Sequence, residues 1–244
     1  MMGISYETVR DPIKRLGLVV LRTDEIIERE MAQVLPLNDT TRLHVSRIPF
    51  APEVTQSTLA QMAVDLPASV RLFPDAPFDV VGYGCTSGAT VIGSSRISDL
   101  ITSSCRTGAA CDPIASVIAA AEQLGVRNLG MVTPYITKVS NTMRQHLEAS
   151  GIAVSALESF NIIEDSIVAQ VSPTSIKDAA IRVGQGECDA VFISCTNLAA
   201  LGVIVEIESI IGKPVLTSNQ ALAWAMCQAA GLRPQHGFGQ LLTQ

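Results

Sequence analysis

The chain has 244 residues, of which 48% are hydrophobic and 16% charged, and its formal net charge is −6. This length allows one or two domains with a sizeable core, and the acidic balance argues against a nucleic-acid-binding protein, which would carry basic clusters. No apolar run reaches the roughly 18 residues that a membrane-spanning helix needs. The N-terminal sequence has no apolar region typical of a signal peptide. We therefore expect a cytoplasmic protein that binds neither nucleic acid nor a membrane.

Short apolar runs alternate with stretches of helical periodicity in the first half of the chain. The apolar or alternating runs predict strands, and apolar residues on one face, such as Leu59, Met62 and Leu66, predict helices. The predicted strands are 16–21, 42–48 and 79–83, and the predicted helices are 24–35, 55–68 and 92–102.

The second half follows the same order. Gly125 and Gly151 stand where glycine commonly ends a helix. Strand and helix alternate throughout, which predicts an α/β fold with parallel sheets flanked by helices. The predicted strands are 129–133, 152–157, 190–194 and 214–217, and the predicted helices are 113–124, 138–150, 173–183, 198–211 and 219–231.

One motif occurs twice in the chain. Residues 79–88 read DVVGYGCTSG, and residues 189–198 read DAVFISCTNL. In each copy an aspartate precedes a short apolar strand, and a cysteine follows the aspartate by six positions. The two cysteines, Cys85 and Cys195, lie 110 positions apart.

A second pair of segments agrees with this repeat. Residues 15–20 read RLGLVV and residues 128–133 read NLGMVT, at an offset of 113. Two unrelated segments that share nearly one offset indicate a tandem duplication. We expect two pseudo-symmetric α/β lobes, the first formed by residues 1–112 plus 218–244 and the second by residues 113–217.

Four polar turns are predicted to meet between the lobes. In open parallel sheets the site lies beyond the carboxyl ends of the strands. The turns at Thr23-Asp24, at Cys85, at Tyr135 and at Cys195 all follow predicted strands. An active site in the cleft between the lobes follows from this placement.

The cysteine and histidine pattern does not indicate a metal site. There is no Cys-x-x-Cys, the three histidines are scattered, and no glycine-rich nucleotide-binding motif occurs. We therefore expect no metal and no cofactor. Four of the six cysteines are expected to be buried small hydrophobic residues. These are Cys105, Cys111, Cys188 and Cys227.

Two thiols on opposite faces of a small carboxylate allow two reactions. One thiol can remove an α-proton while the other delivers a proton to the opposite face, or one thiol can add to a C=C bond that then rotates. Both routes develop charge on an oxyanion, which needs hydrogen-bond donors. Thr86, Ser87, Thr196 and Asn197 stand beside the cysteines as candidate substrate-binding groups. A helix beginning after each cysteine is expected to lower the pKa of its thiol.

The chain resembles the Asp/Glu racemase superfamily over nearly its whole length. More narrowly, it resembles the branch of maleate cis-trans isomerases, arylmalonate decarboxylases and ectoine/hydroxyectoine-utilisation racemase-like proteins. The most specific matches are the two cysteine motifs and the VTPY segment. The motifs that carry the resemblance are GLVVLRTDEIIERE (17–30), RIPF with VTQSTLAQM (47–62), GYGCTSG (82–88), VTPY (132–135), ESFN (158–161) and SCTNL (194–198).

The resemblance implies two α/β lobes with the site between them. It implies that Cys85 is a nucleophile, that Cys195 is a general acid/base, and that Tyr135 and Asn161 bind a substrate carboxylate. The decarboxylases keep only the second cysteine, so the presence of Cys85 disfavours decarboxylation. A homodimer or homotetramer is also implied.

The chain departs from the maleate isomerases at Asp24. Those enzymes carry an asparagine at this turn that holds a carboxylate, whereas an ionised aspartate repels one. Asp24 is therefore protonated, or points elsewhere, or faces a cationic part of the substrate, as an amino acid or an ectoine-type compound would have. It is also a candidate cap of the following helix, with Glu28 in the first turn.

Three hypotheses for function follow. The first is a cofactor-independent isomerase of a small carboxylate, with maleate as the leading substrate. The second is a two-base racemase or epimerase of an amino acid or ectoine-type compound. The third is a non-catalytic carboxylate-binding protein.

Overall fold

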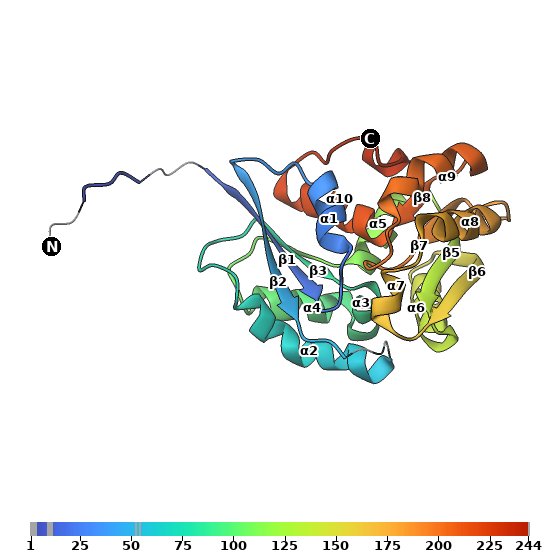
Figure 1. Ribbon diagram of the computed structural model, residues 1–244, viewed down its shortest axis with the longest axis horizontal. Coiled ribbons are helices and arrows are strands. Elements are labelled where there is room, and N and C mark those ends of the chain that lie inside the picture. Colours follow the sequence, from blue (N-terminus) through green and yellow to red (C-terminus); the bar gives the residue numbers. More distant parts are fainter. Residues whose placement is uncertain (1–3, 9–11, 52, 54, 244) are drawn as a thin grey trace.

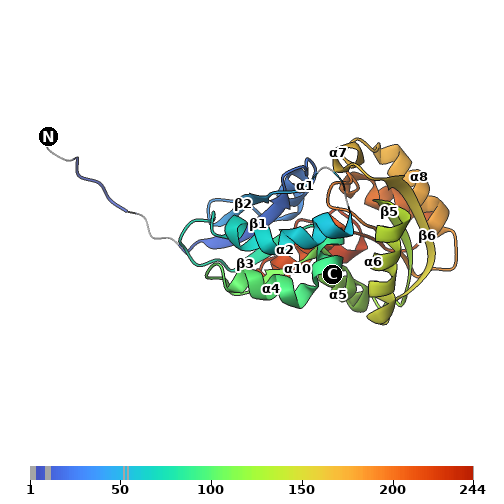
Figure 2. The same ribbon diagram turned by 90° about the horizontal axis from the view of Figure 1, so that it is seen from below.

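The computed structural model describes residues 4–8, 12–51, 53 and 55–243. It contains two separate four-stranded parallel sheets, each flanked by helices (Figures 1 and 2). This arrangement confirms the predicted α/β class with two lobes. The first sheet consists of β1 (Lys14–Leu21), β2 (Thr41–Ile48), β3 (Val80–Gly84) and β4 (Ala110–Cys111), and the second of β5 (Asn128–Tyr135), β6 (Ala153–Ile162), β7 (Ala190–Ile193) and β8 (Val215–Thr217).

The two sheets have the same strand order. The first is ordered β2-β1-β3-β4 and the second β6-β5-β7-β8, so β1 and β5 are the equivalent inner strands. All but the first residues of β1 and β5 are buried, because helices cover both faces of each sheet. The repeat read from the sequence therefore corresponds to a repeat of topology.

The repeated aspartate has one role in both lobes. The Asp79 carboxylate accepts a hydrogen bond from the Arg15 backbone N–H at 2.9 Å. The Asp189 carboxylate accepts from the backbone N–H groups of Arg127 and Asn128, also at 2.9 Å. Each aspartate thus joins the start of the cysteine-bearing strand to the start of the neighbouring inner strand.

Helices connect consecutive strands, and their starts are capped by side chains. Thr55, Asp112, Ser172 and Thr217 each accept a hydrogen bond from a backbone N–H in the first turn of the following helix. The α-helices are α1 (Ile27–Val34), α2 (Gln56–Val70), α3 (Thr86–Ile92), α4 (Ser94–Thr102), α5 (Pro113–Gln123), α6 (Thr137–Ala149), α7 (Asp165–Val168), α8 (Pro173–Gly184), α9 (Ile204–Ile211) and α10 (Ser218–Ala230), and the 3-10 helices are η1 (Leu201–Val203) and η2 (Gln240–Thr243).

Helix α10 brings the end of the chain back to the first lobe. It follows β8 of the second sheet, yet it packs against α1, α5 and β3. Its first residues therefore lie where the two lobes meet. The exact domain division at residues 112, 113, 217 and 218 stays a prediction.

Several elements differ from those predicted. Helix α3 begins at Thr86, directly after Cys85, so it lies ahead of the predicted helix 92–102. Tyr135 is the last residue of β5 and does not lie on a turn. Strand β6 extends to Ile162, and the predicted helix 198–211 is a turn followed by η1 and α9. The short elements β4 and α7 were not predicted.

Residues 4–8 extend away from the two lobes (Figure 1). Within the described part of the chain, none of the helices combines the length and the apolar character needed to cross a membrane.

Candidate active site

The two motif cysteines lie at the carboxyl ends of equivalent strands. Cys85 directly follows β3, and Cys195 follows β7 after one intervening residue. Both side chains are buried, with 3% and 6% of their surface exposed. The Ser218 hydroxyl accepts one hydrogen bond from the Cys195 backbone N–H and another from the hydroxyl of Thr86, the residue after Cys85, so the two motifs meet at one side chain. The structure thus joins the predicted catalytic pair in one cluster between the lobes.

Cys85 is held by the start of α3. The Gly88 backbone N–H donates to Cys85 Sγ at 3.3 Å, and the Ser87 hydroxyl lies 3.7 Å from the sulfur. A Cβ at position 88 would lie 3.0 Å from the sulfur, so glycine leaves room for this contact. The helix start therefore presents a donor to the thiol, as expected.

The pKa of Cys85 is nevertheless raised. Burial raises it to about 12, which outweighs the lowering by the Gly88 amide and Ser87, and the charges of Asp165 and Asp24 raise it further. The expectation that the helix start leaves Cys85 with a lowered pKa is therefore wrong. The reason is that a buried thiolate loses more solvation free energy than one hydrogen bond from an amide restores.

Cys195 sits in a strained backbone conformation. Its φ of 152° lies in a region that favours glycine, and Asn161 is the other such non-glycine residue among those described. The Ser218 hydroxyl accepts a hydrogen bond from the Cys195 backbone N–H at 3.0 Å, and the Asn197 N–H donates to Cys195 Sγ at 3.3 Å. These contacts hold the strained residue in place.

Tyr135 connects the two cysteine motifs. It is buried at the end of β5, and its hydroxyl interacts with Cys195 and with Ser87. Burial raises the pKa of Cys195 well above its usual value, and so does the charge of Asp165, whereas hydrogen bonding from Tyr135 and the Asn197 amide lowers it. The tyrosine is thus placed to donate a hydrogen bond to a group that becomes negative.

The two threonines after the cysteines join the lobes. The Thr86 hydroxyl donates to Ser218 Oγ at 2.8 Å, and the Thr196 hydroxyl donates to the Gly84 carbonyl at 3.3 Å. Each contact links a motif of one lobe to a strand end of the other. Their role as substrate-binding groups stays a prediction, because these hydroxyl protons are already used.

Asp24 caps the start of α1 with one carboxylate oxygen. Its Oδ1 accepts from the backbone N–H groups of Ile26 and Ile27, both at 2.9 Å, which confirms the capping role. Its Oδ2 is buried and has no hydrogen-bond partner among the described residues. Burial raises the pKa of Asp24 to about 6, although the two amides lower it. The nearby Thr196 hydroxyl also lowers this pKa, but it donates its hydrogen bond to the Gly84 carbonyl.

The turn that carries Asp24 is held by Arg47 of β2. Its guanidinium donates to the backbone carbonyls of Leu21, Arg22 and Asp24 at 3.0 to 3.2 Å, and it pairs with Glu28. The arginine therefore fixes the backbone of the turn, while its charge is directed to Glu28.

Asp165 belongs to the site but was not predicted. Its side chain is buried, and its Oδ2 accepts from the Thr23 hydroxyl at 2.6 Å and from Asn197 Nδ2 at 3.1 Å. Burial raises its pKa. The signal that could have found it is the length of β6, because residue 165 lies just beyond the true end of that strand.

Asn197 joins the turns that carry the two aspartates. Its side-chain carbonyl accepts from the Glu25 backbone N–H at 2.9 Å, and its amide donates to both the carbonyl and the carboxylate of Asp165. Its side chain is therefore fully engaged within the protein, and substrate contact by it stays a prediction.

Asn161 lies near the end of β6, the strand that pairs with β5 beside Tyr135. It is exposed, its φ of 54° is left-handed, and its backbone N–H donates to Ser159 Oγ at 2.9 Å. Asparagine tolerates this conformation better than most residues, which gives a backbone reason for its identity. No hydrogen bond to the thiol cluster is found for it among the described residues, and its binding role stays a prediction.

A second buried polar group supports the cluster from behind. The Glu30 carboxylate accepts from Asn219 Nδ2 at 2.8 Å and from the Leu201 backbone N–H at 3.0 Å, and Asn219 also donates to the Thr196 carbonyl. Burial raises the pKa of Glu30 to about 7. Glu30, Ser218 and Asn219 were not predicted, although the run Thr-Ser-Asn directly after a predicted strand was a usable signal.

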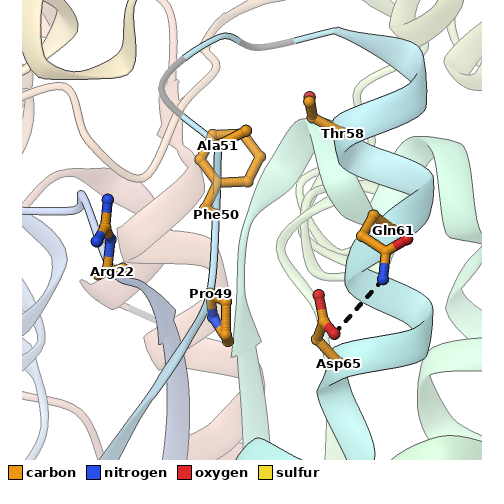
Figure 3. A pocket seen from close by; sticks show the side chains of 7 residues that line it. All are labelled: Arg22, Pro49, Phe50, Ala51, Thr58, Gln61 and Asp65. Carbon is orange, nitrogen blue, oxygen red and sulfur yellow. Dashed lines mark hydrogen bonds between the residues drawn. The ribbon is translucent and has the colours of Figure 1, made fainter.

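A surface pocket of about 360 Å³ lies beside the turn after β1 (Figure 3). It includes neither cysteine, and Gln61 hydrogen-bonds Asp65 within it. This pocket is therefore separate from the buried thiols. Its lining residues are Arg22, Pro49, Phe50, Ala51, Thr58, Gln61 and Asp65.

The remaining cysteines lie outside the cluster. All six are free thiols; Cys188 and Cys227 are buried as expected, and Cys105 and Cys111 are partly exposed. Among the described residues, no group of histidine, cysteine, aspartate or glutamate side chains could hold a metal ion.

Comparison with known proteins places the chain among enzymes. The family model of arylmalonate decarboxylase matches residues 74–242, which is most of the chain. The chain belongs to this family. It is 25% identical to the maleate isomerase of Nocardia farcinica over 243 residues, which cover 95% of this chain and 96% of that protein. The predicted branch, which contains both kinds of enzyme, is thereby confirmed.

Solved structures of this family share the fold. The crystal structure of the maleate isomerase Iso from Pseudomonas putida has a TM-score of 0.85 at 24% identity, covering 94% of this chain and 98% of that one. A Nocardia farcinica maleate cis-trans isomerase mutant with a covalently bound succinylcysteine intermediate has the same TM-score at 22% identity, with the same coverage. The two-lobe architecture is therefore that of the family.

The strain at Cys195 predicts an unusual order of stability. Cys195→Gly removes the strain and Cys195→Ala keeps it, so we expect the glycine variant to be more stable by about 1 kcal/mol. At Cys85, where φ is −153° and unstrained, the glycine variant should be less stable than the alanine variant by about 0.5–1 kcal/mol. Urea unfolding of the four variants measures both differences. If the glycine variant were less stable than the alanine variant at both positions, Cys195 would be unstrained.

Burial of Glu30 predicts that part of the stability is lost as the pH rises. Its pKa is about 7 when folded, above the ordinary 4.5, so the folded protein holds an extra proton between these values. Stability from this group is present below pH 4.5 and decreases up to pH 7, by about 3 kcal/mol. Glu30→Gln should abolish this decrease, measured by urea unfolding from pH 4 to pH 8. The exposed-site variant Glu187→Gln is the control, and parallel curves for Glu30→Gln and wild type would contradict the prediction.

Proposed function

We propose that the chain is a cofactor-independent isomerase of a small carboxylate that uses Cys85 and Cys195. The observation that carries this proposal is the placement of two buried thiols at equivalent strand ends of two lobes, with Tyr135 interacting with Cys195 and with the motif of Cys85. A pair of cysteines that only fill the core would not account for the polar groups that contact each sulfur.

The first reaction to consider is cis-trans isomerisation of a maleate-type dicarboxylate. The relatives named maleate isomerase support it, and in one of them a cysteine carries a succinyl group. In this reaction the Cys85 sulfur adds to one alkene carbon, and the electron pair moves to the adjoining carboxylate. Rotation about the new single bond and elimination of the sulfur then give the trans isomer, while Cys195 exchanges a proton with the substrate from the other side.

The chain supplies donors for the charges that develop. The Gly88 amide stabilises a Cys85 thiolate, and the Asn197 amide and Tyr135 stabilise a Cys195 thiolate. These groups are fixed before substrate arrives, which lowers the reorganisation that the reaction requires. Burial favours neutral thiols in the absence of substrate, so deprotonation has to accompany binding or bond formation.

A second candidate is a two-base racemase or epimerase. The observation that favours it is the buried Asp24 carboxylate, whose free oxygen suits a cationic group better than a second carboxylate. One thiol would remove the α-proton and the other would return a proton to the opposite face. A non-catalytic carboxylate-binding protein is the remaining alternative, and the homo-oligomeric state and the cytoplasmic location stay predictions.

Replacement of either thiol should abolish turnover. We expect Cys85→Ala and Cys195→Ala each to lower kcat by at least about 100-fold, because each removes a group that acts on the reacting carbon. Cys227→Ala, in the core of α10, is the matched buried control and should keep its activity. Circular dichroism checks the fold of each variant. Near-full activity of either single motif variant would exclude the two-thiol mechanism.

Proton NMR in D₂O distinguishes the candidate reactions. Incubation with maleate is expected to yield the vinylic signal of fumarate if a thiol adduct forms. Parallel incubations with L-amino acids and with ectoine should instead lose an α-proton signal if the protein is a two-base racemase. No change in any tube, with the ligands still bound, would favour the binding protein.

A further inference from the structure

Two buried carboxylates face both thiols. Asp24 and Asp165 are 1% and 2% exposed, and the charge of each raises the pKa of both Cys85 and Cys195. Asn197 links both aspartates to the second thiol, because its backbone N–H donates to Cys195 Sγ, its side-chain amide donates to the Asp165 carboxylate, and its side-chain carbonyl accepts from the backbone N–H of the residue after Asp24. Asp165 was found only in the structure, and together with Asp24 it gives the site a pair of negative groups.

In the described part of the chain, no cationic side chain neutralises this pair. Among the described residues, neither aspartate takes part in an ion pair. Arg47 of β2, which holds the turn that carries Asp24, is directed to backbone carbonyls and to Glu28. The partners of Asp165 Oδ2 are the neutral Thr23 hydroxyl and Asn197 amide. The negative charge of the two aspartates is therefore not offset by any cation among the described residues.

The free oxygen of Asp24 points to a ligand. Buried carboxylate oxygens are normally hydrogen-bonded, and leaving one without a partner is costly. Helix capping accounts for Oδ1, which accepts from two backbone amides, but it does not account for Oδ2. A substrate group with an N–H donor would satisfy this oxygen.

Resting on the two-cysteine function proposed above, we propose that Asp24 and Asp165 bind a positively charged nitrogen of the substrate. The substrate class is then a zwitterion, a carboxylate that also carries an ammonium or amidinium group, and not a dicarboxylate. Asp24 contacts the nitrogen through its free oxygen, and Asp165 supplies the second charge. Of the two candidate reactions, this substrate class favours racemisation or epimerisation.

The chemistry of the thiols agrees with this substrate class. A second carboxylate beside Asp24 and Asp165 would bring a third negative charge into a buried site, and it would raise the pKa of both thiols further. A cationic nitrogen would offset the two aspartates and lower the pKa of both thiols. Binding of the correct substrate would thereby help to produce the thiolate that the reaction requires.

A pair of ligands of the same shape tests the proposal. Succinate and 3-amidinopropionate share the same carbon chain and one carboxylate, and they differ only in whether the other end is a carboxylate or an amidinium. Isothermal titration of the wild-type protein is expected to show that 3-amidinopropionate binds about tenfold tighter than succinate, or more, because like charges repel in a buried site. Asp24→Asn and Asp165→Asn should each lower this preference by about tenfold.

Asp112→Asn is the matched control. Asp112 is also a buried aspartate that caps a helix, α5, through a hydrogen bond from the Ala115 backbone N–H. Its variant should keep the wild-type preference, and thermal unfolding checks that all three variants are folded. Equal or tighter binding of succinate by the wild type, undetectable binding of 3-amidinopropionate, or an unchanged preference in both site variants would overturn the proposal.

The titration is independent of turnover. It can fail while the cysteine variants still show a two-thiol isomerase, which would leave the proposed function in place with another substrate class. Conversely, full activity in a cysteine variant would remove the proposed function without changing the charge preference of the site.

Discussion

The hydroxyl of Ser218 holds both cysteine motifs at once. It accepts a hydrogen bond from the Cys195 backbone N–H and another from the Thr86 hydroxyl, so one oxygen between the lobes contacts the residue after the first thiol and the backbone of the second. Ser218 begins α10, the helix that follows the second sheet and packs on the first lobe. The relative position of the two thiols thus depends on how the chain crosses between the lobes, and the Thr196 contact with Gly84 adds a second link.

Burial raises the pKa of both kinds of acid in this site but leaves them in different charge states. It raises the pKa of Cys85 to about 12 and that of Asp24 to about 6. Near neutral pH the thiols are therefore neutral, and Asp24 is largely ionised. The site is a pair of neutral thiols beside a pair of carboxylates, and its charge state is suited to a ligand that brings a positive charge.

The repeat in the sequence predicts the parts of the site that the duplication preserved, and it misses the parts that each lobe acquired separately. The positions of Cys85 and Cys195 follow from the repeat, because an aspartate and a buried strand precede each of them. Asp165 does not follow from it, because β6 is an outer strand of its sheet whose polar, partly exposed second half hides where the strand ends. The raised pKa of Cys85 was also missed, since sequence spacing locates the Gly88 amide but says nothing about how deeply the sulfur is covered.

The two thiols are equivalent in topology but not in surroundings. Cys85 has an ordinary extended backbone and stands at the start of α3, whereas Cys195 is strained and precedes a turn. The turn after Cys195 carries Asn197, which reaches Asp165, while the helix after Cys85 offers only the small residues Ser87 and Gly88. Duplication therefore supplied two similar strand ends. Their later divergence allows one thiol to act at the start of a helix and the other within a network of fixed hydrogen bonds. A reaction that needs two different roles at opposite faces of one carbon requires this asymmetry as much as it requires the repeat.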